Sequence, residues 1–384
     1  MDISSNRVER QKLFKNDPIG YLIDSIPGRA VIRITVLCMG IYATFIILFG
    51  VIISTTRNAV FISILDSREL PLVLFTSFVY FPLVWTIYQW QVRGIKATIL
   101  QLAENGIFTD SKNKLNPEHF FENIIVEEWG KRSNFIIILI ITFSTLVFFT
   151  ISTFINPSGF ITMAIMKDQL WWKIYPLYFL FLWTPLQFIN VYIIAWILLR
   201  QVFVIKGLNN LIDNYSISPK LFHPDKCNGL APIGTYAIRS TMIIILFAVW
   251  ITIQILSPTF YGKPMNFDLT TTIQLLFFTF AAPALLIAVV WKTHSAMCEA
   301  KNRATEAIAK QIRLLLDKNT KDYSKPIESI KSLKEKLDII DREMKTWPFR
   351  RFEARNFSLA SIAPLFISIT SFIFQEYLSK YIFP

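Results

Sequence analysis

The sequence predicts an all-α membrane protein, a polytopic helix bundle of about seven spanning helices with the N-terminus inside and the C-terminus outside. Of its 384 residues, 53% are hydrophobic and 17% are charged, and the mean hydropathy is +0.45. Soluble domains carry about 25% charged residues, so this chain is too apolar to be one of them. Its apolar runs also reach about 20 residues, the length that a helix needs to cross about 30 Å of hydrocarbon.

Seven apolar runs are the predicted spans: 34–53, 70–90, 135–155, 175–199, 241–256, 269–291 and 357–378. The fifth run is short, and an alternative start near Tyr236 would place Arg239 at the membrane interface. With the N-terminus inside, the four inner segments hold 33 of the 39 Lys and Arg residues. Because basic residues are retained on the cytoplasmic side, this asymmetry predicts a cytoplasmic N-terminus in the plasma membrane, which is the inner membrane in a bacterium.

The net charge of +12 has two interpretations, contact with nucleic acid or contact with anionic lipid headgroups. Inner loops of membrane proteins carry such an excess wherever they face anionic headgroups, so lipid is the expected partner and nucleic acid is not. The first 28 residues carry four basic side chains but no apolar run, so no cleavable signal peptide is expected. Cys38, Cys227 and Cys298 fall in a span and in inner segments, where no disulfide framework is expected.

The chain divides into a predicted membrane part at 1–291, a cytoplasmic part at 292–356 and a terminal span at 357–384. The inner segments 91–134 and 200–240 belong to the membrane part. Each inward-running span is expected to continue as a helix beyond the membrane, which would form a cytoplasmic stalk.

A heptad pattern in the third inner segment predicts an antiparallel coiled-coil hairpin. The seam residues follow one another at spacings of three and four: Ile330, Leu333, Leu337, Ile340, Met344 and Trp347. An earlier apolar stripe comprises Ala304, Ile308, Ile312 and Leu315, and a turn at 317–326 would join the two helices. The hairpin either buries its own seam or binds a partner protein, since heptads alone name no partner.

Prolines inside the spans are the main irregularity of the membrane part. Each removes a backbone hydrogen bond and favours a kink, and hydroxyl and amide side chains lie nearby. These groups either line a polar path or hinge, or they satisfy the freed backbone and hold helices together. The candidate pathway or hinge residues are Pro82, Pro185, Gln187, Asn190, Pro283 and Pro364.

The inner loop at 221–234 reads LFHPDKCNGLAPIG and contains His223, Asp225 and Cys227 at alternate positions. These residue types bind metals, but a structural zinc site needs four ligands and the other histidines are distant in sequence. Pro, Asp, Asn and Gly in this order favour tight turns. An ordered turn with no metal is therefore expected.

Motifs for catalysis are missing from the sequence. It has no Gly-rich phosphate loop, no HExxH, no GxSxG and three histidines in all, so no enzyme activity, catalytic residue or cofactor is expected. The first six spans also lack acidic and basic residues in their cores, which argues against a proton-coupled pump.

The segment 346–356, TWPFRRFEARN, joins the hairpin to the last span and is called the elbow below. Trp347, Arg350, Arg351 and Arg355 give it the composition of an amphipathic interfacial segment that couples the hairpin to that span. The HPD-x-x-(G/N)-G-L loop at 223–230 and the W-P-F of the elbow together resemble uncharacterised bacterial multi-pass membrane proteins. The resemblance implies a bacterial inner membrane and no particular activity.

Three functions fit these observations. The first is an oligomeric channel or pore-type effector that is gated or assembled through its cytoplasmic helices. The second is a membrane-anchored sensor or scaffold whose hairpin binds a cytoplasmic protein. The third is a facilitator for a neutral or lipid-like solute.

Overall fold

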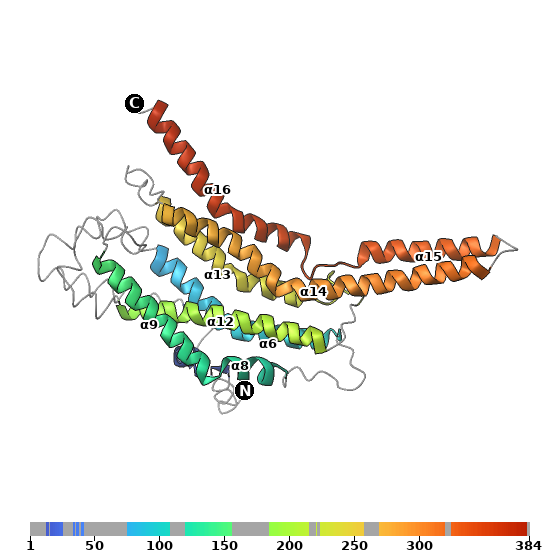
Figure 1. The fold of residues 1–384 in the computed structure, drawn as a ribbon, viewed down its shortest axis with the longest axis horizontal. Helices are drawn as coiled ribbons and strands as arrows, with labels where there is room; N and C mark the ends of the chain where they lie inside the picture. The colour runs from blue at the N-terminus through green and yellow to red at the C-terminus, as the bar shows by residue number, and fades with distance from the viewer. Residues whose placement is uncertain are drawn as a thin grey trace, which may run out of the picture.

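A computed structural model describes residues 13–14, 16–25, 34, 36–37, 40–41, 75–107, 120–155, 184–214, 220, 223–256, 269–318 and 324–381. Every regular element among these residues is a helix. The helices form an elongated bundle, and two of them extend from one end of it (Figure 1).

The centre of the bundle is built from α6 (Phe81–Glu104), α12 (Thr184–Asn214) and α13 (Ala231–Leu256). The 24 residues of α6 bury one apolar face, because their large side chains recur every three or four positions. The buried residues of this face are Val84, Tyr88, Val92, Ile95, Ile99 and Leu102. Helix α9 (Arg132–Ile155) packs on α12, whereas α14 (Leu269–Lys318) and α16 (Arg351–Tyr381) pack on α13.

Short elements complete the bundle. The helix α2 (Pro18–Ser25) lies near the chain start, and the π-helix η1 (Thr76–Tyr80) leads directly into α6. Pro82 is the second residue of α6, directly after η1, and it supplies no backbone N–H where the π-helix changes to an α-helix. The elements η2 (Phe121–Val126) and α8 (Glu127–Trp129) precede α9.

Four helices in the described part of the chain are long and apolar enough to cross a membrane: Phe188–Asp213, Ala231–Ile253, Thr272–Asp317 and Phe352–Ile373. They correspond to the fourth to seventh predicted spans. The third predicted span falls within α9, whose stretch with described side chains, Arg132–Val147, is apolar but shorter than these four. Most of the run 34–53 and residues 70–74 lie outside the described residues, so seven spans and an inside N-terminus stay predictions.

Three helices continue well beyond their predicted spans. The helices α6, α12 and α14 run to Glu104, Asn214 and Lys318 without interruption. Helix α13 begins at Ala231, ten residues before the predicted fifth span, so the alternative start nearer Tyr236 was closer to the observed helix.

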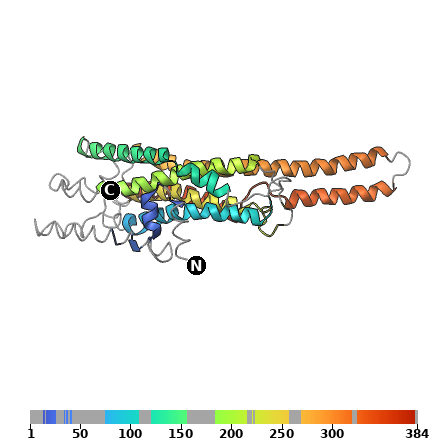
Figure 2. The ribbon, with the colours of Figure 1, turned by 90° about the horizontal axis from the view of Figure 1, so that it is seen from below.

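Helix α15 (Ser324–Glu343) runs back beside the C-terminal part of α14 (Figures 1 and 2). Its predicted seam residues, such as Leu333 and Leu337, are half-buried, and Ile340 is buried against the base of the pair. The facing residues Ala304 and Ile308 of α14 are also half-buried. Helix α15 starts two residues before Pro326, because a proline is tolerated in the first turn of a helix.

The polarity of α16 is the inverse of that expected in water. Its outward side is apolar, with Leu359 and Phe366 each 64% exposed, whereas Ser368 is fully buried. The Ser368 and Thr252 hydroxyls both donate hydrogen bonds to the carbonyl oxygen of Pro364, at 2.9 and 3.2 Å. Because exposed apolar surface of this extent is unfavourable in water, this face suits contact with lipid chains.

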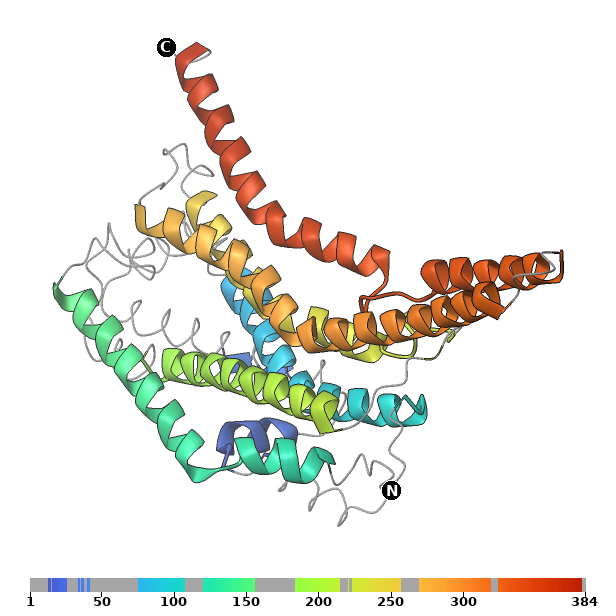
Figure 3. The same cartoon turned by 45° about the vertical axis from the view of Figure 1, so that its right-hand side comes forward.

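Pro364 lies inside α16 and removes one of its backbone hydrogen bonds. Figure 3 shows that α16 changes direction along its length, so that its C-terminal half diverges from α13 and α14. The bend is the kink that an internal proline is expected to produce.

Candidate functional site

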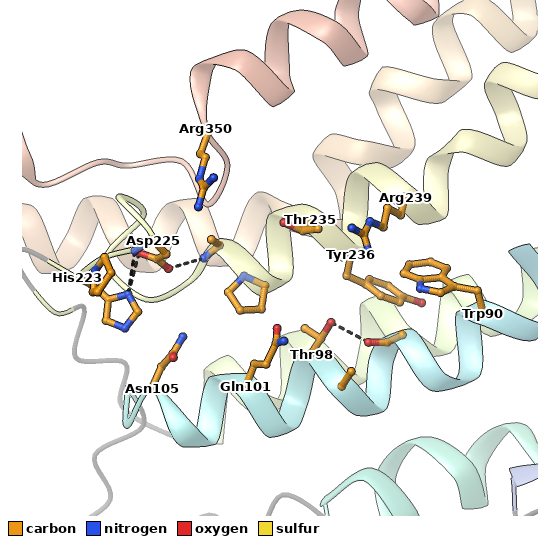
Figure 4. A pocket seen from close by; sticks show the side chains of 15 residues that line it. Trp90, Thr98, Gln101, Asn105, His223, Asp225, Thr235, Tyr236, Arg239 and Arg350 are labelled. Atoms are coloured by element: carbon orange, nitrogen blue, oxygen red, sulfur yellow. Dashed lines mark hydrogen bonds and ion pairs between the residues drawn. The ribbon is translucent and has the colours of Figure 1, made fainter. Parts of the chain in front are cut away.

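The loop at 223–230, called the HPD loop below, is an ordered turn held by one carboxylate. Asp225 accepts hydrogen bonds from the backbone N–H groups of Cys227 at 2.8 Å, Gly229 at 2.9 Å and Ala231 at 3.1 Å. Ala231 is the first residue of α13, so Asp225 also satisfies a free donor at the start of that helix. Figure 4 shows Asp225 beside His223, whose Nδ1 lies 3.0 Å from its Oδ1.

Backbone geometry and protonation agree with this structural role. Lys226 and Asn228 have φ values of 58° and 57°, and Gly229 has 89°, which Asn and Gly adopt more readily than other residues. Burial alone would raise the pKa of Asp225, but the three N–H groups and His223 lower it below its usual value. Burial raises the pKa of the Cys227 thiol to about 12, so this group is not a thiolate at neutral pH.

No group of three or more His, Cys, Asp or Glu side chains in the described part of the chain is placed to hold a metal ion. The three candidates of the loop have other environments: Asp225 accepts backbone hydrogen bonds, the His223 ring faces Asp225 at 3.0 Å, and Cys227 is buried.

The elbow packs on the HPD loop and on α13. Asn228 donates a hydrogen bond at 2.8 Å to the carbonyl oxygen of Lys345, directly before the elbow, and Asn105, directly after α6, donates one at 2.8 Å to the carbonyl oxygen of Gly229. A Cβ atom added at Gly234 would lie 1.8 Å from the carbonyl oxygen of Pro348. Glycine at 234 is therefore required for the elbow backbone to approach α13 so closely.

A histidine connects the elbow to α14 as well. The ring of His294 stacks on Trp347 with centroids 3.9 Å apart, and its Nδ1 lies 2.6 Å from the carbonyl oxygen of Thr346. Trp347 in turn stacks on Phe349 at 5.4 Å. The elbow thus contacts α13, α14 and the HPD loop at one junction, which sequence reasoning placed at the membrane interface without naming these contacts.

A cavity of about 600 Å³ lies beside this junction, between α6, the HPD loop and α13 (Figure 4). Arg239 and Arg350 reach it from α13 and from the elbow, and both are exposed. Trp90 and Tyr236 stack on each other in its wall at a centroid distance of 5.5 Å. The remaining lining residues are Gly94, Ala97, Thr98, Gln101, Asn105, His223, Pro224, Asp225, Ala231, Pro232 and Thr235.

A second polar cluster is buried deeper in the bundle. Arg200 of α12 forms an ion pair with Asp17, and both side chains are at least 98% buried. Tyr88 and Tyr192 donate hydrogen bonds to the same carboxylate at 2.5 and 3.0 Å. The guanidinium also lies over the Tyr88 ring at 4.6 Å and over Trp196 at 5.1 Å, which adds cation–π stabilisation.

This cluster joins helix α2 to α6 and α12 of the bundle. Asp17 caps α2 by accepting a hydrogen bond from the Gly20 N–H at 3.1 Å, and at the other end of α2 Asp24 forms an ion pair with Arg93 of α6 at 2.5 Å. The cluster is not evident from the sequence because Asp17 and Arg200 are 183 residues apart. The Asp-Pro pair at 17–18 was the available signal, since Asp at the N-cap and Pro at the first position mark a helix start.

The predicted pathway residues are not gathered into one path. Asn190 is buried and accepts a hydrogen bond from the indole N–H of Trp85 at 3.1 Å, so its amide joins α12 to α6. Pro185 lies in the first turn of α12, and the side chain of Gln187 lies outside the described residues. Pro283 and Pro364 are internal to the separate helices α14 and α16.

An uncharged polar chain does connect the three central helices. Gln91 of α6 donates hydrogen bonds to the Ile197 carbonyl at 3.1 Å and to the Gln201 side chain at 3.2 Å. Gln201 donates to the Ser240 hydroxyl of α13 at 3.1 Å. Sequence analysis stopped its spans close to these residues and did not single them out.

The predicted coupling residues of the elbow separate in space. Trp347 contacts α14 through His294, Arg350 lines the cavity, and Arg355 lies over the ring of Phe352 at 5.5 Å. The side chain of Arg351 lies outside the described residues.

Comparison of the chain with protein-family models, with curated proteins and with solved structures finds no match. The function is therefore inferred from the geometry of the junction, the cavity and the buried cluster.

Proposed function

We propose that this protein is a membrane effector of the channel type, which acts as an oligomer and is gated or assembled through its cytoplasmic helices. The observation that carries the proposal is the junction at the elbow. There the end of the hairpin, the start of α16 and the start of α13 are joined by Asn228, Gly234 and His294.

Two features make this junction suited to transmit movement. Helix α14 is continuous over 50 residues, so the segment that pairs with α15 and the apolar segment beside α13, which contains Pro283, are parts of one helix. Helix α16 presents apolar side chains outward and bends at its internal proline, so its far half is less constrained by neighbours than α13 or α14. A shift of α15 relative to α14 would therefore be passed through the elbow to α16.

The central helices supply polar groups for a path. Gln91, Gln201 and Ser240 lie between α6, α12 and α13 and are uncharged, as expected for a route that admits ions or small solutes through hydroxyls and amides. These groups are hydrogen-bonded to one another in the described arrangement, so conduction requires their separation.

The test is flux of ions and of a small dye from liposomes that contain the purified protein. A Leu337→Asp variant places a charge in the half-buried seam of the hairpin, and Ser332→Asp places the same charge on its exposed side. We expect Leu337→Asp to change the flux and Ser332→Asp to leave it unchanged. A monomeric protein that passes neither ions nor dye under any condition would overturn the proposal.

A second set of variants tests the route itself. Gln201→Leu removes the middle of the polar chain while preserving the size of the side chain, and flux through this variant should fall. Gln187→Leu/Asn190→Leu tests the residues selected from sequence. Because Asn190 joins α12 to α6 through Trp85, loss of folding in this variant would have to be separated from loss of flux by its elution as an intact oligomer.

A second function, a membrane-anchored scaffold, is favoured by one observation. The hairpin exposes Leu314, Leu316 and Ile339 at 53%, 58% and 40%. These side chains lie outside the seam, so a partner protein could bind them without opening the hairpin. A stoichiometric partner that is lost with Leu314→Asp/Leu316→Asp, in a protein that passes no solute, would favour the scaffold over the channel.

A further inference from the structure

We propose that the cavity between α6, the HPD loop and α13 binds a phosphate ester, with Arg239 and Arg350 as its charged contacts. The inference concerns binding and stands apart from the channel proposal. In the proposed channel, a ligand that contacts both arginines would also link the elbow to α13, two of the elements that meet at the junction.

The two arginines are available for an external anion. Neither guanidinium forms an ion pair with a carboxylate in the described part of the chain, and both border the same cavity (Figure 4). They come from separate elements, α13 and the elbow, and lie on opposite sides of Thr235 in Figure 4, so a ligand that contacts both would extend across the cavity. The planar guanidinium, with five N–H donors, matches the oxygens of phosphate better than an ammonium does.

The nearby acids are occupied by other donors. Asp225 lines the cavity, but its oxygens accept three backbone N–H groups and one faces His223 at 3.0 Å. Glu353 follows Arg350 closely, and its carboxylate accepts a hydrogen bond from the Arg350 backbone N–H at 3.1 Å. Asp225 keeps its negative charge at neutral pH, so the phosphate is expected away from it, toward Arg239, which Figure 4 shows on the other side of Thr235 from Asp225 and Arg350.

Size and lining indicate an ester with an organic part. About 600 Å³ falls within the range of small-molecule sites, which is roughly 300–1,000 Å³ and well above what an inorganic anion needs. The stacked pair Trp90 and Tyr236 offers an apolar wall, and Gln101 and Thr235 offer hydrogen-bonding groups for hydroxyls. Glycerol phosphate, free in solution or as the headgroup of a phospholipid, has this combination of a phosphate and hydroxyls.

The source of the phosphate ester is decided by two arms of one experiment on the full chain in uncharged detergent. In the first arm, short-chain phosphatidylglycerol is titrated and bound lipid is counted by native mass spectrometry, with phosphatidylcholine as the uncharged comparison. In the second arm, glycerol phosphate is titrated against the same protein. Binding in the first arm alone identifies lipid, and binding in both, with competition, identifies the free ester as sufficient.

The decisive variant is Arg239→Gln/Arg350→Gln, with Arg313→Gln/Arg342→Gln as the control that removes the same charge from exposed hairpin positions. We expect the first variant to bind the preferred probe about tenfold more weakly or worse, and the control to bind as the original chain does. Equal weakening in both variants, or no saturable binding of either probe, would overturn the proposal. The melting temperatures of all three proteins without ligand show whether each of them is folded. The charge-preserving variant Arg239→Lys/Arg350→Lys should retain part of the affinity.

Discussion

Substitution of Gly234 by alanine tests whether the elbow is held against α13. An added Cβ would lie 1.8 Å from the Pro348 carbonyl oxygen, whereas real Cβ contacts are almost never below 3.0 Å. The obstructing atom is backbone, so the elbow must move by about 1.2 Å or more. Overpacking of this kind costs about 1–3 kcal/mol.

The sign of the effect is informative because Gly234 lies in a helix. Replacing a helical glycine by alanine ordinarily stabilises by up to about 1 kcal/mol. Gly40→Ala is the control, since a Cβ there meets no atom of the described residues within 4 Å. We expect Gly40→Ala to be neutral or stabilising and Gly234→Ala to be less stable than it by about 1–3 kcal/mol.

The assay is equilibrium unfolding in mixed micelles, together with distance measurements between spin labels on α13 and on the far half of α16. A lower stability with an altered distance indicates that the elbow sets the position of α16. Equal unfolding free energies for the two variants, with an unchanged distance, would refute the close packing of the elbow and the coupling argued from it.

Three other predictions concern the buried and capping groups. Removing the charge of Arg200 with Arg200→Gln should cost about 3–5 kcal/mol, because it leaves Asp17 buried without its cation, and a double-mutant cycle with Asp17→Asn should show strong coupling. Asp225→Ala should lose about 1 kcal/mol in unfolding experiments through loss of the α13 cap. The pKa of Asp225 is lower in the folded than in the unfolded protein, so its ionised carboxylate stabilises the fold. This stabilisation is complete above the unfolded pKa of about 4 and is lost as pH falls through the lower folded pKa. The stability difference between Asp225→Ala and the original chain should therefore shrink below about pH 4. Leu333→Asp should lower the helicity of the hairpin in circular dichroism more than Ser332→Asp, and equal spectra would argue against a buried seam.

Helix positions could be predicted where periodicity is strong and local. The heptad residues of α15 and the facing stripe of α14 are among the less exposed positions of the two paired segments, because a spacing of three and four places side chains on one face of a helix. The turn at Asp225 was likewise predictable, since its donors lie two to six residues away. These features depend on neighbours in sequence.

The site depends on contacts between distant segments, which one sequence does not reveal. Asp17 and Arg200 form an ion pair although they are 183 residues apart, and Arg239 and Arg350 border one cavity only because the elbow returns to α13. The pathway residues were chosen as polar groups in apolar runs, but Asn190 is engaged with Trp85, while the polar chain begins with Gln91, a residue at a predicted span boundary. The polarity of these side chains identified them as candidates but did not indicate which neighbouring helix each would contact.

The length of α14 separates two electrical environments. About 27 of its 50 residues follow the predicted sixth span, and at 1.5 Å per residue they reach about 40 Å beyond it. The screening length of a physiological salt solution is about 8 Å, so the tip of the hairpin is several such lengths from the end of the predicted sixth span, whereas Arg239 and Arg350 lie within seven residues of the predicted fifth and seventh spans. A change in the charge of the lipids would then alter the electrostatic potential at the elbow and not at the tip. A protein bound to the tip would affect the same junction only by moving the helices of the hairpin.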